Sequence, residues 1–164
     1  MAKFYIFLDI DGALWDVKWR LVQIFKGRIK KGGLVKSFNQ ESIRSLNYLI
    51  ESLENKYETI LVISSSWRYN MEMTKKTLFN QGLNYKKQML KTGICTNRQK
   101  EIEEFLIENN INENFLVIDD AKLDFQQKNF IKTSIKDGCL NINKVKNWLK
   151  LNNLLNLNDI VLEN

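Results

Sequence analysis

The fold is decided by the stretch KFYIFLDIDGALW, residues 3–15. Residues 4–8 are an apolar run of strand-forming residues, which stops abruptly at Asp9 and Asp11, followed by Gly12. Two carboxylates this close repel each other, and burying them costs free energy unless a cation or hydrogen-bond donors compensate. The alternative is a strand that simply ends at a polar turn, because Asp-Gly is a common turn pair.

The composition describes a chain that can build a hydrophobic core. Its 164 residues favour a single domain over residues 1–164, and 44% of them are apolar, so a folded protein is expected. The net charge of +6 is compatible with an anionic partner. The two cysteines, without a secretory signal, predict reduced thiols and a cytoplasmic location. No segment approaches the roughly 20 apolar residues that span a bilayer, so no membrane partner is expected.

The chain contains no histidine. This excludes Ser-His-Asp and Cys-His catalysis as well as histidine-based zinc sites, and two cysteines are too few for a thiolate zinc site. Any metal must therefore be held mainly by oxygen atoms, which points to Mg²⁺ or a similar hard cation.

Residues 15–38 are basic and rich in aromatic side chains. The segment has no acidic residue between Lys18 and Glu41, and its glycines favour a hairpin-like flap over a helix. Such a flap can contact phosphates and stack on bases. The alternative is a solvated loop whose aromatic side chains pack back on the core.

The remaining chain alternates between helices and strands. The apolar spacing predicts helices at about 40–56, 69–81, 96–109 and 143–151, and strands at 59–63, 115–118 and 130–134. Asn39 or Ser37 is expected to cap the first helix, and a capping box from Thr96 to Gln99 is expected to begin the third. The strands are continuous apolar runs, which is typical of parallel strands covered on both faces. The pattern predicts a three-layer α/β fold with a mainly parallel sheet.

Polar side chains follow three of these strands. The first strand leads to the two aspartates described above, the second to Ser64 and Ser65, and the third to Asp119 and Asp120. Lys100 lies in the first turn of the helix before the third strand, where a cation opposes the helix dipole and so suggests a partner outside the helix. Ligands bind outside the carboxyl ends of the strands in open α/β sheets, so these side chains are expected to meet there.

In this order the motifs resemble those of the haloacid dehalogenase (HAD) superfamily of phosphatases. The stretches VISSSWR, RQKEIEEFL leading into FLVIDD, and FIKTSIKDGCLN resemble the HAD domains of Swiss Army Knife RNA-repair proteins. The resemblance covers most of residues 3–150. It implies a Rossmann-like HAD fold, phosphatase activity and a Mg²⁺ cofactor.

The resemblance also implies a role for each acidic motif. Asp9 would be the nucleophile that becomes an aspartyl-phosphate, and Asp11 the general acid and base. Mg²⁺ would be held by Asp9, by the backbone carbonyl of Asp11, and by a carboxylate from Asp119 or Asp120.

Two further motifs would hold the phosphoryl oxygens. The resemblance assigns this role to Ser65 and Lys100. The register does not decide between Ser64 and Ser65 for this role, and Arg98 is the alternative to Lys100. Arg68, just past the serine strand, is either a substrate contact or one member of a surface ion pair.

The spacing of the motifs bears on the substrate. Residues 12–63 and 66–99 are too short for a separately folded cap domain besides the required core elements, so only the flap is expected beside an open site. An open site admits the end of a polymer, which favours a Mg²⁺-dependent phosphomonoesterase acting on nucleic-acid termini. The alternatives are a phosphatase of a small nucleotide or sugar phosphate, and a non-catalytic HAD-like binding module. The oligomeric state stays open.

Overall fold

The computed structural model describes residues 1–15, 38–95, 97–134, 136 and 139–155. Within these ranges the chain forms a five-stranded sheet of order β3-β2-β1-β4-β5, in which every neighbouring pair of strands is parallel. The strands are β1 (Ala2–Leu8), β2 (Tyr57–Ile63), β3 (Leu90–Lys91), β4 (Phe115–Asp119) and β5 (Phe130–Lys132). The flap predicted at 15–38 lies outside the described residues except at its two ends.

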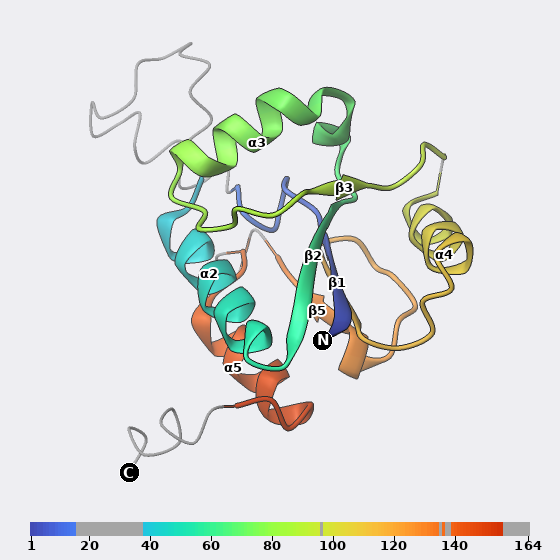
Figure 1. The fold of residues 1–164 in the computed structure, drawn as a ribbon. Helices are drawn as coiled ribbons and strands as arrows, with labels where there is room; N and C mark the ends of the chain where they lie inside the picture. Colours follow the sequence, from blue (N-terminus) through green and yellow to red (C-terminus); the bar gives the residue numbers. More distant parts are fainter. Residues whose placement is uncertain (16–37, 96, 135, 137–138, 156–164) are drawn as a thin grey trace, which may run out of the picture.

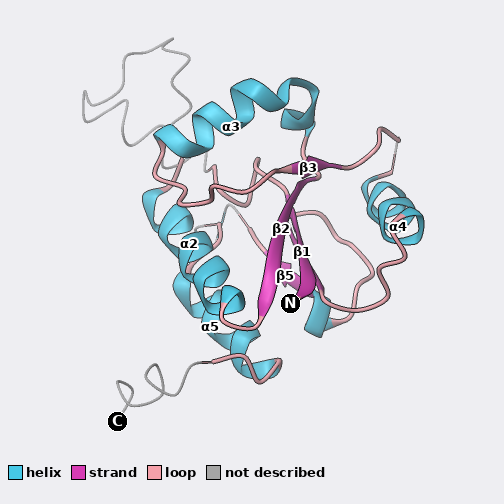
Figure 2. Ribbon diagram, viewed as in Figure 1, coloured by secondary structure: helices cyan, strands magenta, loops and turns pink. Residues whose placement is uncertain are grey.

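Helices cover both faces of the sheet. They are α2 (Gln40–Glu54), α3 (Met71–Asn80), α4 (Arg98–Glu108) and α5 (Ile142–Leu151), with two short 3-10 helices, η1 (Ser66–Asn70) and η2 (Gln127–Asn129). In Figure 1, α2 and α5 lie on one side of the sheet and α4 lies on the other. Figure 2 shows the same layers, with the strands in magenta between cyan helices. The predicted three-layer α/β fold is confirmed, and the sheet is parallel in all its described strands.

β1 is the central strand, and its side chains alternate between two cores. Ile6 and Leu8 pack with the residues of α2 and α5, whereas Phe7 packs with those of α4. Phe7 and Phe105 of α4 meet edge to face, with ring centroids 5.4 Å apart. Burial of such a side chain contributes about 1.5–3 kcal/mol. A strand covered on both faces needs apolar residues at successive positions, which explains the continuous run.

Asparagine side chains cap the helices that lead to the site. Asn39, one of the two predicted caps, accepts the Glu41 N–H at 3.0 Å at the start of α2. The predicted capping box at Thr96 is wrong, because the cap of α4 is Asn97, which accepts the Lys100 N–H at 3.3 Å. Asparagine caps a helix at least as well as threonine does. No helix in the described ranges has the length and apolar character that crossing a membrane requires.

Candidate active site

The sheet register brings three of the predicted motifs to one level. Leu8, the last residue of β1, pairs with the last residue of β2 and with Ile118 of β4. The next residues along these strands are Asp9, Ser64 and Asp119. The Asp9 N–H donates to the Ile118 carbonyl at 2.9 Å, and the Ser64 N–H donates to the Leu8 carbonyl at 3.1 Å. The carboxyl edge of the sheet therefore brings together the aspartates after β1, the serines after β2 and the aspartates at the end of β4.

Asp9 is buried, with 4% of its surface exposed, and it lies next to a second buried carboxylate. Arg98 of α4 donates from Nη1 to Asp9 Oδ1 and to Asp119 Oδ2, at 3.0 Å in both cases. Burial, and then the charge of Asp119, raise the pKa of Asp9 from 3.8 to about 6, although Arg98 lowers it. Burial also acts to lower the pKa of Arg98, but the two carboxylates outweigh it and raise that pKa above its usual value.

Asp119 is held in place by the chain on both sides of it. Its Oδ1 accepts the Ala121 N–H at 2.7 Å, and its own carbonyl accepts the Thr133 N–H at 2.9 Å. Burial raises the pKa of Asp119, while the Ala121 N–H, Arg98 and Lys132 lower it. Two buried acids whose charged forms are both disfavoured are typical of a site that receives a further cation.

Three carboxylates can share such a cation. Asp9, Asp119 and Asp120 each offer an oxygen, and these oxygens lie within 4.8 Å of one another. Gly12 makes room for this cluster, because a Cβ at Gly12 would lie 2.4 Å from the Asp120 carboxylate. Its φ of +93° is also one that glycine adopts readily and other residues rarely do. An all-oxygen donor set with excess negative charge fits a hard divalent cation.

Asp11 lies beside this cluster and is oriented by its own donors. Trp67 Nε1 donates to Asp11 Oδ1 at 3.1 Å, and Ser66 Oγ approaches Oδ2 at 3.5 Å. Asp11 is half-buried, and its carboxylate is not among the three that cluster. The Asp11 carboxylate is therefore held in a fixed orientation, from which it can contact a bound ligand.

Ser64 and Ser65 both have buried hydroxyls without a hydrogen-bond partner of good geometry among the described residues. The Ser65 hydroxyl lies close enough to Asp9 to lower the pKa of that carboxyl. A buried hydroxyl without a partner costs free energy, so it is expected to have one when a ligand is bound.

Arg98, and not Lys100, is the cation that the structure brings to Asp9. Lys100 projects to the surface, where its side chain is 63% exposed and its Nζ lies 3.6 Å from Glu104. Both residues belong to the first turn of α4, which begins after Asn97. The position of that cap decides which of the two faces the sheet.

Arg68 takes part in a buried ion pair rather than a surface one. Its Nη2 donates to Glu101 Oε1 at 2.7 Å, and its Nη1 donates to the Ser64 carbonyl at 3.0 Å. The Arg68 and Glu101 side chains are 6% and 3% exposed. Glu101 Oε2 also lies 3.7 Å from Arg98 Nε. Charges of alternating sign therefore run from Asp9 through Arg98 and Glu101 to Arg68, and they join the start of α4 to η1, which follows β2.

Sequence reasoning missed two members of this constellation. Glu101 lies three residues after Arg98, a spacing at which helical side chains meet, and Trp67 directly follows the serine motif. These positions could have made Glu101 and Trp67 candidate site residues. The sequence does not show which side chains they contact, because those contacts depend on the tertiary structure.

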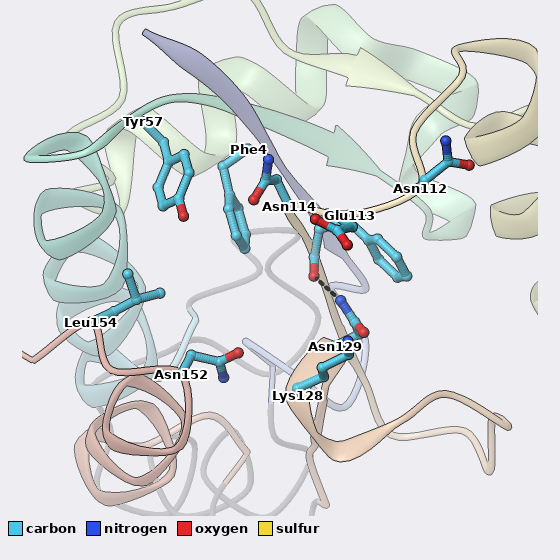
Figure 3. Close-up of a pocket in the computed structure, with 10 residues that line it drawn as sticks. Phe4, Tyr57, Asn112, Glu113, Asn114, Lys128, Asn129, Asn152 and Leu154 are labelled. Carbon is cyan, nitrogen blue, oxygen red and sulfur yellow. Dashed lines mark hydrogen bonds between the residues drawn. The ribbon is translucent and has the colours of Figure 1, made fainter.

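A pocket at the other edge of the sheet does not belong to this site. Figure 3 shows its lining residues, which include Phe4 and Tyr57 near the amino ends of β1 and β2. Asn129 Nδ2 donates there to the Phe115 carbonyl at 2.8 Å. The pocket has a volume of about 210 Å³ and contains none of the predicted site residues. It lies at the opposite ends of the strands from Asp9.

Comparison with known proteins agrees with the geometry of the site. The family model described as the HAD domain in Swiss Army Knife RNA repair proteins matches residues 5–143. Searches among curated proteins and among solved structures returned no match to the chain. The matched range contains β1 from Tyr5 onward, every predicted site residue and the start of α5. The chain therefore belongs to the family of HAD domains found in Swiss Army Knife RNA-repair proteins.

Proposed function

We propose that this protein is a Mg²⁺-dependent phosphomonoesterase that removes terminal phosphates from nucleic acid through an aspartyl-phosphate on Asp9. The observation that carries the proposal is the position of Arg98, 3.0 Å from both Asp9 and Asp119. It combines a buried nucleophile, a fixed cation and a second acid at one sheet edge. Positioned charges of this kind stabilise the transition state of phosphoryl transfer.

The first half of the reaction forms the intermediate. An Asp9 carboxylate oxygen attacks phosphorus, a bond forms between them, and the bond from phosphorus to the ester oxygen breaks. Asp11 donates its proton to the leaving oxygen, which departs as an alcohol. The Trp67 N–H fixes the orientation of the Asp11 carboxyl during this transfer. Arg98, which donates to Asp9, and the buried Ser65 hydroxyl beside Asp9 would hold the phosphoryl oxygens.

The second half returns the enzyme to its starting state. Asp11, now a carboxylate, takes a proton from water while the water oxygen attacks the phosphorus of the aspartyl-phosphate. The bond between phosphorus and Asp9 breaks, and inorganic phosphate leaves. Asp9 is again a carboxylate and Asp11 is again protonated, so atoms and charges balance over the cycle.

Mg²⁺ would be held by Asp9, Asp119 and Asp120, with the Asp11 carbonyl as a further ligand. When bound, the ion neutralises the charge that accumulates between the carboxylates and the phosphoryl group. The close spacing of the three carboxylates and the raised pKa values of two of them support this assignment.

A nucleic-acid end is the favoured substrate for two reasons. The matched family is named for RNA-repair proteins, and the chain carries a net charge of +6. A positive protein attracts a polyanion more strongly than it attracts a single small phosphate ester. The chain has only two cysteines, Cys95 and Cys139, and this low number is compatible with the cytoplasmic location that we expect.

Hydrolysis of p-nitrophenyl phosphate tests the chemistry. We expect activity with Mg²⁺, loss of that activity in EDTA, and its abolition in Asp9→Asn. Activity that survives in Asp9→Asn would exclude Asp9 as the nucleophile. Titration of the wild-type protein with Mn²⁺, followed by electron paramagnetic resonance, tests the metal site separately, and it should show binding that Asp119→Asn weakens.

Phosphate release from a 3′-phosphorylated oligonucleotide tests the substrate class. We expect a higher kcat/KM for the oligonucleotide than for the corresponding free mononucleotide. The reverse order would favour the small-molecule phosphatase. The absence of activity on both, with metal binding intact, would favour a binding module.

A further inference from the structure

A second pocket opens along the edge strand β5. Its volume of about 360 Å³ lies within the range of about 300–1,000 Å³ that is usual for ligand sites. Phe125, Phe130, Trp148 and Leu151 contribute an apolar wall. Phe125 and Phe130 are only half-buried and Leu151 is 55% exposed, so this wall is accessible to a ligand.

Lys132 connects this pocket to the candidate active site. It lines the pocket, and it pairs with Asp119 in the ladder between β4 and β5. Its Nζ donates to the backbone carbonyl of Asp120. One residue therefore belongs both to the pocket and to the immediate surroundings of the carboxylate cluster.

A second lysine lines the same pocket. Lys144 of α5 also lines the pocket, and its Nζ donates to the Lys132 carbonyl at 3.1 Å. An ammonium group has three donors, so each lysine can still donate to a phosphate. None of the described residues that line the pocket is acidic. The pocket thus combines positive charge with an aromatic wall.

We propose that this pocket binds the penultimate nucleotide of a single-stranded nucleic-acid substrate, that is, the nucleotide next to the one that carries the terminal phosphate. Its base would stack on Phe125 and Phe130, and its phosphodiester would contact Lys132 and Lys144. Aromatic side chains with cations beside them are the usual means of binding single strands without sequence preference. The assignment rests on the proposed function, because it gives a place to the chain whose end is dephosphorylated at Asp9.

The structure favours nucleic-acid binding at this edge over pairing of β5 with a second copy of the protein. β5 has only three residues, and Lys132 at its end is exposed. Short edge strands with lysine are a common means of preventing such pairing. The charge also favours a polyanion over a second protein of the same positive charge.

A series of 3′-phosphorylated substrates tests the subsite. The proposal predicts that kcat/KM rises at least about fivefold from the mononucleotide to the dinucleotide, because the second base gains a stacking partner. A dinucleotide analogue without the base at the 5′ residue should lose this gain. Equal kcat/KM values for the mononucleotide, the dinucleotide and the abasic analogue would overturn the proposal.

A pair of variants on α5 provides the matched comparison. Lys144→Gln removes a pocket ammonium, whereas Lys150→Gln removes an exposed charge on the same helix outside the pocket. The variants are made in the Asp9→Asn background, and binding of a fluorescent 3′-phosphorylated oligonucleotide is followed by anisotropy. Lys144→Gln should make the plot of log affinity against log salt shallower by about 0.7, which corresponds to one lost phosphate contact. Lys150→Gln should change it less.

The two proposals fail in different ways. If the wild type hydrolyses no phosphomonoester but Lys144→Gln still weakens oligonucleotide binding selectively, the proposed function fails and the subsite stands. If hydrolysis is normal but the two lysine variants behave alike, the subsite is refuted alone. Sedimentation of the wild type and of Lys144→Gln completes the test. A wild-type dimer that the substitution dissociates would mean that the pocket binds a second copy of the protein, and it would overturn the proposal.

Discussion

Replacement of Glu101 by glutamine should cost the protein about 3 kcal/mol of unfolding free energy or more. The substitution keeps the size of the side chain but removes the charge that faces Arg68 at 2.7 Å. Both side chains are almost fully buried, and Glu101 also accepts the Cys95 N–H at 3.0 Å. Removal of one partner from a buried ion pair costs about 3–5 kcal/mol, because the remaining charge is left without compensation. Glutamine can still accept hydrogen bonds, which places the expected loss near the lower limit.

Glu104→Gln is the matched control, three residues further along α4. Glu104 faces Lys100 at 3.6 Å, and these side chains are 50% and 63% exposed. An exposed pair at this spacing contributes about 0.3–0.5 kcal/mol. Urea denaturation at pH 7 in EDTA measures both variants against the wild type, with the slope of the transition checked for equality.

A third variant separates the charge from the packing. In the double variant Arg68→Met/Glu101→Met both charges are absent, so we expect it to be more stable than Glu101→Gln. The reasoning is refuted if Glu101→Gln loses less than about 1 kcal/mol, or if the double variant is the less stable protein. Either result would mean that the pair is not buried in the way described.

Three further predictions concern the carboxylate cluster. Arg98→Ala should lower kcat for p-nitrophenyl phosphate by about 10²-fold or more, because it removes a positioned donor, whereas Lys100→Ala should change kcat by less than about twofold; steady-state kinetics compares them. Burial raises the pKa of Asp9 to about 6, so the folded protein binds more protons than the unfolded chain between pH 3.8 and 6. In EDTA its stability should therefore fall by up to about 3 kcal/mol as the pH rises through this interval, and denaturation of Asp9→Asn should lack this part of the dependence. Gly12→Ala combines an unfavourable φ of +93° with a Cβ 2.4 Å from Asp120, and it should lower stability by about 1–2 kcal/mol and weaken Mn²⁺ binding measured by calorimetry.

The elements that could be predicted are those with a strong local signal. The apolar runs of β1, β2 and β4 identify strands that are buried on both faces, and parallel order then places Asp9 and Asp119 at one edge. β3 could not be predicted, because a pair of residues, Leu90 and Lys91, has no periodicity. Its existence depends on its partner strand β2.

The choice between Arg98 and Lys100 illustrates what a motif does not determine. Successive residues of a helix differ by about 100° in direction, so a shift of one residue in the helix start changes which side chain faces the sheet. Both Thr96 and Asn97 are acceptable caps by residue type. The pairing of Arg68 with Glu101 is harder still, because it joins segments that meet only after the sheet has formed.

The central position of β1 in the sheet has a consequence for how the protein folds during its synthesis. β1 precedes both of its neighbours in the chain, and Leu8 finds its partners only at residues 63 and 118. During synthesis the apolar strand β1 stays without its β4 partner until more than half of the polypeptide has been made. In this period it is exposed to chaperone binding and to aggregation. Recovery of the proposed phosphatase activity after refolding would accordingly report formation of the β1–β4 pairing, the most distant in sequence among the described strands, rather than formation of the helices.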